Sequence, residues 1–351
     1  MGTSSGAARR PVVMAAARAV ISPEFGDLLA ARAELVLDPP GPAALSQADV
    51  FLASSHRPLL AADLECATRL AVVTQVGTAV HVDVPAATRL GIPVLNNRGQ
   101  NADSVAEHTI ALLLAVAKNL VRGDAEVRSR VPWEVAAPHL VNHELRGKTL
   151  GIVGFGAVGS RVAAIASRGL GMRVLGCDAV PGTVADQGYQ ELPLDDLLPR
   201  VDVLSLHLAA TPQTRGLIGR DRLRLLPRHA WLINTARADV LDYDGLAAAL
   251  RAGQLAAAGI DTWPGHRADP RSPLIDLPNV VLSQHNAGFT HEAISRMARA
   301  TAGGIWETLA GTRPVSSTLL NPEIWARRRR PSGDLDLRPL RAPAAGSTPP
   351  G

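Results

Sequence analysis

The stretch Gly151–Asp178, GIVGFGAVGSRVAAIASRGLGMRVLGCD, has the pattern of a strand, a tight turn, a helix and a second strand. The apolar run Thr149–Val153 leads into its turn, which has the GxGxxG spacing. In this motif the first glycine permits the turn, the second lets the backbone approach a pyrophosphate, and the third lets helix and strand pack closely. The N-terminus of the helix adds N–H donors and a positive dipole. The turn consists of Gly154, Phe155, Gly156, Ala157, Val158 and Gly159.

The surroundings of this turn favour NAD as the bound dinucleotide over a glycine turn that binds nothing. A second apolar run, Met172–Cys177, ends on Asp178, nineteen residues beyond Gly159. An acidic side chain at that place can accept hydrogen bonds from the adenosine ribose hydroxyls. No arginine follows closely to receive a 2′-phosphate, because the next residues are Ala-Val-Pro-Gly-Thr. We therefore predict that NAD is the cofactor and is preferred over NADP.

Composition narrows the class of protein. The 351 residues suffice for two domains with full cores. Cys66 and Cys177 lie in apolar contexts, which suits a reducing compartment better than a disulfide framework. Without a signal-peptide core or an apolar run long enough to span a bilayer, a cytoplasmic protein with no membrane partner is expected. We predict no metal site.

The charge distribution does not favour nucleic acid as a partner. The sequence pI is about 9.6, yet the net charge is only +4. The obvious basic cluster, Arg327 to Arg330, lies in a Pro-rich tail, and no aromatic stacking platform interleaves with the basic residues.

Short apolar runs alternate with helix-like segments on both sides of the glycine turn. This pattern predicts an α/β fold with two doubly wound parallel sheets. The runs before the turn are Val12–Ala17, Glu34–Leu37, Val50–Ser54, Leu70–Thr74 and Pro93–Leu95. Those after the βαβ stretch are Val201–Leu206, Ala230–Asn234, Ala257–Ile260 and Val280–Ser283.

These runs suggest a domain division. We expect a flavodoxin-like substrate domain at 11–101 and 290–325 and a Rossmann NAD domain at 102–289, with a cleft between them that holds the chemistry. The Gly/Ser/Pro/Arg-rich ends, 1–10 and 326–351, are predicted to be disordered. One long apolar segment, Asp103 to Arg128, predicts a helix buried on more than one side, between two domains or two subunits.

Three polar segments follow predicted strands and could carry chemistry. They are Asn97 to Asn101, Asn234 to Arg237, and Ser283 to Gly288. An arginine can donate two N–H bonds to a carboxylate, and a histidine can exchange a proton near neutral pH. With NAD, these groups describe reduction of a 2-oxo acid. A surface ion pair for Arg237 and a structural loop histidine for His285 are the alternative interpretations.

Four segments in this order and spacing resemble the D-isomer-specific 2-hydroxyacid dehydrogenases, which include phosphoglycerate, D-lactate and formate dehydrogenases. The resemblance covers about residues 45–315. The segments are ATRLGIPVLNNRGQNADSVAEH (87–108), ELRGKTLGIVGFGAVGS (144–160), INTARADVLDYDGLAAALRAGQ (233–254) and LPNVVLSQHNAG (277–288).

The resemblance implies an NAD-dependent homodimer that acts on a small 2-hydroxy or 2-oxo acid. Arg237 would hold the substrate carboxylate and polarise the oxo group, and His285 would give or take the hydroxyl proton. Asn101 matches a substrate-side asparagine of formate-type members, and Gly77 and Thr78 fall near the loop whose amides meet the carboxylate. Asp261 matches the aspartate that contacts the nicotinamide amide. The other cofactor-lining residues implied are His207, Leu208, Ala209, Thr211, Thr235, Ala236 and Gly288.

One position departs from the family pattern. Most members carry a glutamate five residues past the aspartate that matches Asp261, and its carboxylate raises the pKa of the catalytic histidine. Here that position holds His266, which cannot supply an anion and, if protonated, would lower the pKa of His285. His266 could instead bind an extra anionic group of the substrate, Asp269 could take the glutamate's role, or the alignment of this loop could be shifted by a few residues.

Two functions from different classes follow. The first is an NAD-dependent oxidoreductase, favoured by the presence of both Arg237 and His285. The second is a catalytically weak, NAD-sensing dimer that binds partners, as the corepressors that resemble this family do. The missing glutamate is the main point in favour of the second.

Overall fold

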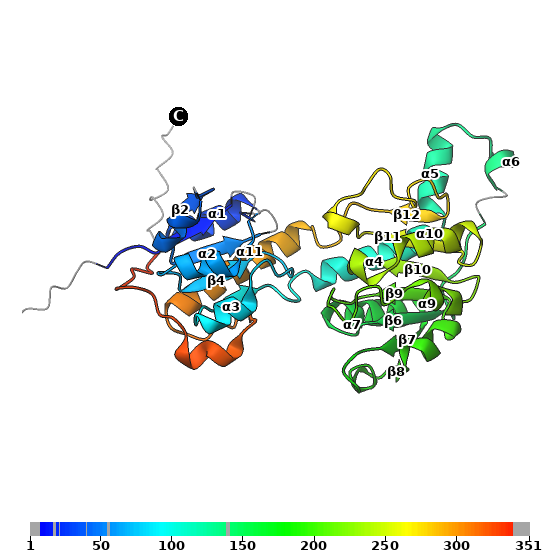
Figure 1. The fold of residues 1–351 in the computed structure, drawn as a ribbon. Helices are drawn as coiled ribbons and strands as arrows, with labels where there is room; N and C mark the ends of the chain where they lie inside the picture. Colours follow the sequence, from blue (N-terminus) through cyan, green and yellow to red (C-terminus); the bar gives the residue numbers. More distant parts are fainter. Residues whose placement is uncertain are drawn as a thin grey trace, which may run out of the picture. The chain divides into compact units, whose positions relative to one another are not determined.

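The computed structural model describes residues 8–16, 19–20, 22–39, 41–54, 57–137 and 141–339. The chain divides into two compact units: unit 1 is formed by Met1–Asn101 with His291–Gly351, and unit 2 by Ala102–Thr290 (Figure 1). Each unit contains one sheet of mainly parallel strands, so the predicted fold class, two doubly wound α/β sheets, is confirmed.

Unit 1 has a six-stranded sheet in the order β13-β5-β4-β3-β1-β2. The order of its five parallel strands, 2-1-3-4-5, is that of a flavodoxin-like domain. The short antiparallel strand β13 adds to β5 and was not predicted, because two residues leave no pattern to detect. The strands are β1 (Val12–Ala15), β2 (Glu34–Leu37), β3 (Val50–Ala53), β4 (Val72–Gln75), β5 (Val94–Asn96) and β13 (Thr318–Leu319).

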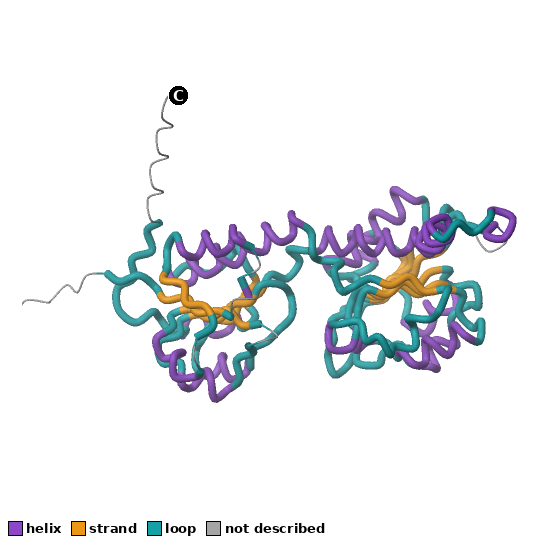
Figure 2. The backbone as a smooth tube through the Cα atoms, turned by 90° about the horizontal axis from the view of Figure 1, so that it is seen from above, coloured by secondary structure: helices purple, strands orange, loops and turns teal. Residues whose placement is uncertain are grey.

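Helices cover both faces of this sheet (Figure 2). Val13 and Leu52 pack with the helix pair α1 and α11, whereas Met14 and Phe51 pack on the opposite face with α2 and α3. Successive strand residues point to opposite faces, so a sheet buried on both faces needs near-continuous apolar strands. The helices are α1 (Pro23–Ala30), α2 (Ala61–Cys66), α3 (Val84–Arg89) and α11 (His291–Leu309).

Unit 2 has a seven-stranded sheet in the order β12-β11-β10-β9-β6-β7-β8. Strand order reverses between β6 and β9, which is the switch point where doubly wound sheets bind ligands. The strands are β6 (Thr149–Val153), β7 (Arg173–Cys177), β8 (Gln190–Glu191), β9 (Val203–Leu206), β10 (Trp231–Asn234), β11 (Ala257–Ile260) and β12 (Val280–Leu282).

Two hydrophobic clusters hold helices against the two faces of the unit 2 sheet. One contains Ile110 and Val162 from α4 and α7, and the other contains Leu223 and Leu246 from α9 and α10. Asp242 is the N-cap of α10 and accepts a hydrogen bond from the backbone N–H of Gly245. The helices are α4 (Ala102–Ala117), α5 (Leu120–Arg128), α6 (Trp133–Ala136), α7 (Ala157–Ala164), α8 (Leu194–Leu197), α9 (Arg220–Leu225) and α10 (Tyr243–Arg251).

The predicted single helix from Asp103 to Arg128 is wrong, because the chain bends by 61° between α4 and α5. Asn119 at the break has φ of 45°, a left-handed conformation that asparagine tolerates better than most residues. In the described residues no single helix is long and apolar enough to cross a bilayer. Within the described part of the chain, this bent pair alone meets the length and composition criteria together, and α4 is a core helix.

The ends of unit 1 differ from the disorder predicted for 1–10 and 326–351 wherever the structure describes them. Arg9 exchanges backbone hydrogen bonds with Asp334 and Asp336, and the backbone N–H of Arg329 donates to the carbonyl of Gly91 at 2.6 Å. Composition misleads here because these contacts are made by the backbone, which composition does not record. Residues 1–7 and 340–351 lie outside the described residues.

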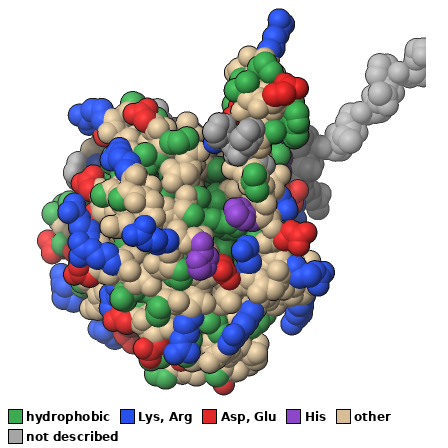
Figure 3. Space-filling model, turned by 90° about the vertical axis from the view of Figure 1, so that its right-hand side faces the viewer, with side chains coloured by type: hydrophobic (Ala, Val, Ile, Leu, Met, Phe, Trp, Pro, Cys, Tyr) green, Lys and Arg blue, Asp and Glu red, His purple; other side chains and the backbone are tan. Residues whose placement is uncertain are grey.

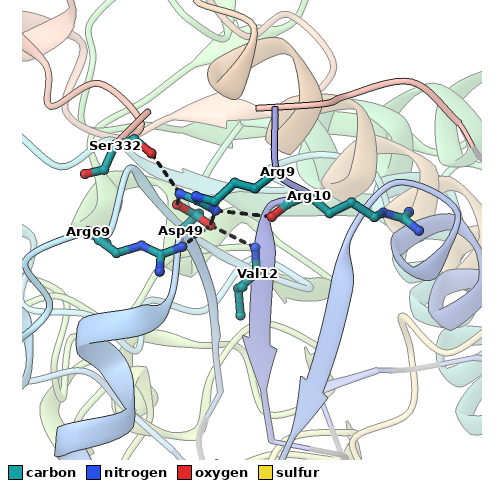
Figure 4. Close-up of polar contacts among 6 residues, drawn as sticks. All are labelled: Arg9, Arg10, Val12, Asp49, Arg69 and Ser332. Atoms are coloured by element: carbon teal, nitrogen blue, oxygen red, sulfur yellow. Dashed lines mark hydrogen bonds and ion pairs between the residues drawn. The ribbon is translucent and has the colours of Figure 1, made fainter. Parts of the chain in front are cut away.

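A buried carboxylate fixes this arrangement (Figure 4). Asp49 is fully buried just before β3. Arg9 donates to both of its oxygens at 2.6 and 2.7 Å, Arg69 donates at 3.0 Å, and the backbone N–H of Val12 donates at 2.8 Å. Arg9 also donates to the carbonyl of Ser332 at 2.9 Å. The first and last described segments are therefore joined to the sheet through one anion.

Candidate active site

The polar segments of unit 2 begin in one row along its sheet. The last residues of six parallel strands pair in register from β7 to β12, so the residues that follow them lie side by side at the carboxyl edge. These following residues are Asp178, Gly154, His207, Thr235, Asp261 and Ser283. The row crosses the switch point between β6 and β9. The predicted cofactor residues of unit 2 lie on the turns that start from this row.

The glycine turn has a backbone that leaves space at its centre. Gly154 has φ of +93°, and a Cβ there would lie 2.6 Å from the carbonyl oxygen of His207. A Cβ on Gly159 would overlap the carbonyl oxygen of Gly154. A Cβ on Gly156 would meet nothing within 4 Å, and Gly156 is the N-cap of α7 with no side-chain cap. Open space and uncapped amides at a helix N-terminus fit the pyrophosphate of a dinucleotide.

Asp178 is tied to the glycine turn. Its carboxylate accepts hydrogen bonds from the backbone N–H of Phe155 at 2.7 Å and of Val180 at 3.0 Å. The side chain of Phe155 is buried and stacks at a tilt against Tyr189, so only the backbone of Phe155 belongs to the turn's polar surface. The acidic residue and the glycine turn therefore form one structural unit.

The segment after β9 carries the next predicted residues. His207 is partly buried, and its Nε2 lies 2.9 Å from Ser205 Oγ. Burial lowers the pKa of His207 to about 3, so this imidazole is neutral. Leu208 packs against the core, whereas Ala209 and Thr211 are exposed and form a turn closed by Thr214.

The turn that carries Arg237 is held by a buried asparagine. Asn234 accepts from the backbone N–H of Ala236 at 3.0 Å and donates to the carbonyl of Arg237 at 3.1 Å. Thr235 is buried, and its hydroxyl lies 2.8 Å from that of Thr109 on α4. The guanidinium of Arg237 is half-buried and donates to the carbonyl of Ala236, and burial lowers its pKa. Sequence reasoning placed Asn234 in this segment but gave it no role.

Asp261 is fully buried and organises the segment after β12. It accepts hydrogen bonds from Ser283 Oγ at 2.6 Å and from the backbone N–H groups of Asn286 and Ala287 at 3.1 Å each. The two amides follow His285 directly, and His285 has φ of 56°. The carboxylate thus holds a turn in which a non-glycine residue takes a left-handed conformation. Gly288 follows this turn and is partly exposed.

The backbone of His266 belongs to a short 3₁₀ turn, Pro264–His266, a few residues beyond β11. Its side chain lies outside the described parts of the structure, so its orientation toward His285 stays a prediction. Asp269, the alternative to the missing glutamate, is engaged in a local ion pair with Arg271 at 3.1 Å. That pair lowers the pKa of Asp269 and ties its carboxylate to the loop itself.

The remaining predicted residues belong to unit 1. Gly77 and Thr78 follow β4, and Asn101 lies between β5 and α4. Gly77 has φ of +102°, a Cβ there would meet nothing within 4 Å, and its carbonyl accepts from the backbone N–H of Asn97 at 3.0 Å. All three follow the carboxyl ends of parallel strands of their own sheet. In the described residues, no group of three or more His, Cys, Asp or Glu side chains could hold a metal ion.

Comparison with known proteins identifies the family of the chain. Residues 110–287 match the family model described as D-isomer specific 2-hydroxyacid dehydrogenase, NAD binding domain. The glyoxylate reductase of Korarchaeum cryptofilum is 36% identical over 281 residues, which are 79% of this chain and 83% of the relative. The D-3-phosphoglycerate dehydrogenase of Mycobacterium leprae is 36% identical over 272 residues, 77% of this chain, and the match spans 51% of that relative.

A solved structure supports the same assignment. The D-lactate dehydrogenase of Aquifex aeolicus, complexed with NAD and lactic acid, superposes with a TM-score of 0.74 at 26% identity. The match covers 86% of this chain and 96% of that one. The combination of an extended family match, the glycine turn at the switch point and the row of polar strand ends leads to one conclusion. The chain belongs to the D-isomer specific 2-hydroxyacid dehydrogenase family and is an NAD-dependent oxidoreductase.

Proposed function

We propose that the protein interconverts a small 2-oxo acid and the corresponding 2-hydroxy acid, with Arg237 and His285 as its catalytic residues. One observation carries this proposal: the two residues follow β10 and β12, the strands on either side of β11, at the same edge of the sheet. A cation for a carboxylate and an acid/base group are the two side-chain functions that this reaction needs.

Arg237 binds the substrate carboxylate and polarises the oxo group. Its guanidinium is half-buried, and an arginine keeps its charge at neutral pH even where burial lowers its pKa. Partial burial strengthens its attraction for an anion because less water competes. The side chain of Asn234 accepts from the backbone N–H of Ala236 and donates to the carbonyl of Arg237, which fixes this backbone and limits the positions open to the guanidinium.

His285 transfers the proton of the substrate hydroxyl. A bound nicotinamide supplies or accepts the hydride at the same carbon. Reduction needs His285 protonated beforehand, whereas oxidation needs it neutral, so the two directions have opposite pH dependence.

NAD is the cofactor, and we propose that it is preferred over NADP. The anionic carboxylate of Asp178, fixed against the glycine turn, would repel a 2′-phosphate. The other proposed cofactor contacts are those implied by the family resemblance, from the glycine turn to Gly288. Calorimetric titration should give tighter binding of NADH than of NADPH, and Asp178→Ala should narrow the difference. Equal affinities in the wild-type protein would contradict the preference.

His266 takes the place of the family glutamate near His285 in this proposal. Without a carboxylate there, the pKa of His285 should lie at or below its ordinary value of about 6.5. His266→Glu should move the pH limb of the reduction rate upward, by about one pH unit, because a nearby anion favours the charged imidazole. A limb that stays in place, with NADH binding intact, would show that residue 266 does not face His285.

Unit 1 is proposed to be the substrate domain, with Asn101, Gly77 and Thr78 as its substrate-binding residues. The open space beside Gly77 supports this, because a carboxylate could approach the backbone amides there. Asn101→Ala should raise the KM for the 2-oxo acid without changing NADH affinity.

The experiment that tests the proposed function is NADH oxidation against a panel of 2-oxo acids. Glyoxylate, pyruvate, hydroxypyruvate and phenylpyruvate sample small, methyl, polar and aromatic side chains. At least one should be reduced with the stoichiometric loss of NADH. If NADH binds but no panel member is reduced and no corresponding 2-hydroxy acid is oxidised, the NAD-sensing binding protein becomes the better account.

We also propose that the protein is a homodimer formed through α5, α6 and the following segment. Among the described residues, α5 has no buried side chain. The helices project from unit 2 (Figure 1), and apolar side chains lie on this projection (Figure 3). Val127 is 78% exposed and Trp133 72%, with further exposed apolar side chains at Leu120, Val121, Val135 and Val141. An apolar projection of this kind is typical of a self-complementary interface.

Light scattering coupled to gel filtration tests the dimer. The wild-type protein should have twice the 36.8 kDa mass of one chain, and Val127→Asp should shift it to one chain. Val315→Asp is the matched control, since Val315 is 87% exposed on unit 1. A monomeric wild type, or a Val127→Asp variant that stays dimeric, would overturn the interface.

A further inference from the structure

His108, a helical residue with no role in the proposed chemistry, contacts the strand-end row of unit 2. It lies on α4, and its Nε2 is 2.9 Å from Ser283 Oγ and 3.5 Å from Asp261 Oδ1. The side chain is 24% exposed, so it is largely enclosed by these neighbours. Position 108 is 175 residues away from Ser283 in sequence. The contact therefore joins a core helix to the turn that follows β12.

The direction of the hydrogen bonds follows from proton counting. Ser283 Oγ has one proton and donates it to Asp261 at 2.6 Å, because an ionised carboxylate can only accept. Ser283 Oγ must then accept from His108, so His108 Nε2 carries a hydrogen atom. The imidazole of His108 is a donor in this network. It orients the hydroxyl of Ser283, which in turn donates to the carboxylate of Asp261.

The backbone of Ser283 is held by hydrogen bonds at both its N–H and its carbonyl. Its backbone N–H donates to the carbonyl of Ile260 at 2.9 Å, and its own carbonyl accepts from the indole N–H of Trp263 at 2.7 Å. These two bonds fix the backbone of Ser283, and the contacts of its hydroxyl with Asp261 and His108 fix the side-chain rotamer. The carboxylate of Asp261 is aimed by that hydroxyl at the amides of Asn286 and Ala287.

This series of hydrogen bonds ends at the backbone next to His285. A histidine with φ of 56° has a sparsely populated backbone conformation, which persists only where the surroundings impose it. The backbone N–H groups of Asn286 and Ala287, which follow His285, donate to the carboxylate of Asp261 and hold this turn. Loosening the carboxylate would let the turn relax and move the imidazole.

We propose that His108 is a positioning residue for His285, acting through Ser283 and Asp261. His108 touches neither substrate nor cofactor in this account. It fixes the hydroxyl of Ser283, which fixes the carboxylate, which holds the left-handed turn. The consequence for catalysis rests on the proposed function, whereas the consequence for the backbone does not.

The test compares His108→Leu with His108→Gln, and Ser283→Ala with Ser283→Thr. Leucine and alanine remove a hydrogen-bonding group, whereas glutamine keeps a donor and threonine keeps the hydroxyl. His108→Leu and Ser283→Ala should lower kcat by about 10- to 100-fold, since a displacement of about 1 Å can cost that much. His108→Gln and Ser283→Thr should restore most of kcat. His229→Leu is the matched control, because His229 contacts Asp202 at the opposite end of the strands, before β9.

Amide hydrogen exchange on the full-length protein provides a readout that needs no activity. The segment with Asn286 and Ala287 should exchange faster in His108→Leu and Ser283→Ala, and at the wild-type rate in His108→Gln, Ser283→Thr and His229→Leu. Unchanged exchange and unchanged kcat in His108→Leu would overturn the proposal. Faster exchange in a protein whose wild type reduces no 2-oxo acid would support the positioning role and reject the proposed function instead.

Discussion

Among the described residues, each unit has one completely buried aspartate at an end of its sheet, and the two carboxylates have different partners. Asp49 precedes β3 in unit 1 and is bound by two arginines and one backbone amide. Asp261 follows β11 in unit 2 and is bound by a serine hydroxyl and two backbone amides. Among the described contacts, Asp49 has two ion pairs with arginine, whereas the basic side chain near Asp261 is His108, whose Nε2 lies 3.5 Å from Oδ1.

The difference shows how one buried residue type serves two purposes. A buried carboxylate is costly unless it is fully hydrogen-bonded. Permanent charges from Arg9 and Arg69 compensate Asp49 and bind separate chain segments together, which stabilises the fold. The donors that compensate Asp261 lie on a single turn, so these hydrogen bonds stabilise the conformation of that turn. The first arrangement lies at the amino ends of the strands and the second at the carboxyl ends, where ligands bind in such sheets.

The largest stability effect is expected for Asp49→Asn. The amide removes the charge shared by two arginines and cannot accept at both atoms, which should destabilise unit 1 by about 3 kcal/mol. NADH affinity should be unchanged, since the glycine turn belongs to unit 2. Exchange measured separately for peptides of each unit checks this. Asp221→Asn is the control: its exposed ion pair with Arg224 should matter by less than about 1 kcal/mol. Equal effects of the two variants would remove the structural role of Asp49.

Asp261→Asn should lower the catalytic rate more than it lowers stability. One carbonyl oxygen remains as an acceptor, so the loss of stability should be about 1–2 kcal/mol. The amide nitrogen would face backbone N–H groups, however, and the turn with His285 should open. We expect kcat to fall by about 100-fold. A variant that loses stability like Asp49→Asn while kcat is preserved would erase the distinction between the two aspartates.

His207 can be compared with the two buried carboxylates, because burial keeps its side chain neutral. Its pKa is about 3 in the folded protein, against about 6.5 in an unfolded chain. Between these values the unfolded chain binds more protons, so the free energy of unfolding decreases as pH falls from about 6.5 toward 3. The slope is at most about 1.4 kcal/mol per pH unit for one such group. His207→Asn should make urea midpoints at pH 6 and pH 4 more alike, and an unchanged difference would contradict this.

Much of the fold could be predicted from local pattern. The strands Thr149–Val153 and Ala257–Ile260 have their predicted bounds, because apolar residues in a sheet buried on both faces form uninterrupted runs. The break at Asn119 could not be predicted, since the residues on both sides of it favour helix. The pairing of Arg9 with the segment after Arg329 depends on backbone contacts between the chain's ends.

The candidate site also has a part that could be predicted from the sequence and a part that could not. Glycines and the acid at the end of β7 leave a fixed spacing in sequence, so the cofactor turn was predicted from that spacing. The partnership of His108, Ser283 and Asp261 leaves none, because it joins a helix to two strand ends far away along the chain. A serine at the end of a predicted strand and a histidine on an otherwise apolar helix were the available signals, and both have many structural explanations.

The measurement that tests the central claim most directly is kcat/KM for reduction of a 2-oxo acid by Arg237→Ala and Arg237→Lys. If the guanidinium binds the carboxylate and the developing oxyanion, the alanine variant should lose about 10³-fold. Lysine should recover only part, because an ammonium cannot donate two parallel bonds. NADH binding and thermal stability should match the wild type. An alanine variant with kcat/KM within about three-fold of the wild type would contradict the assignment of this edge of the sheet as the active site.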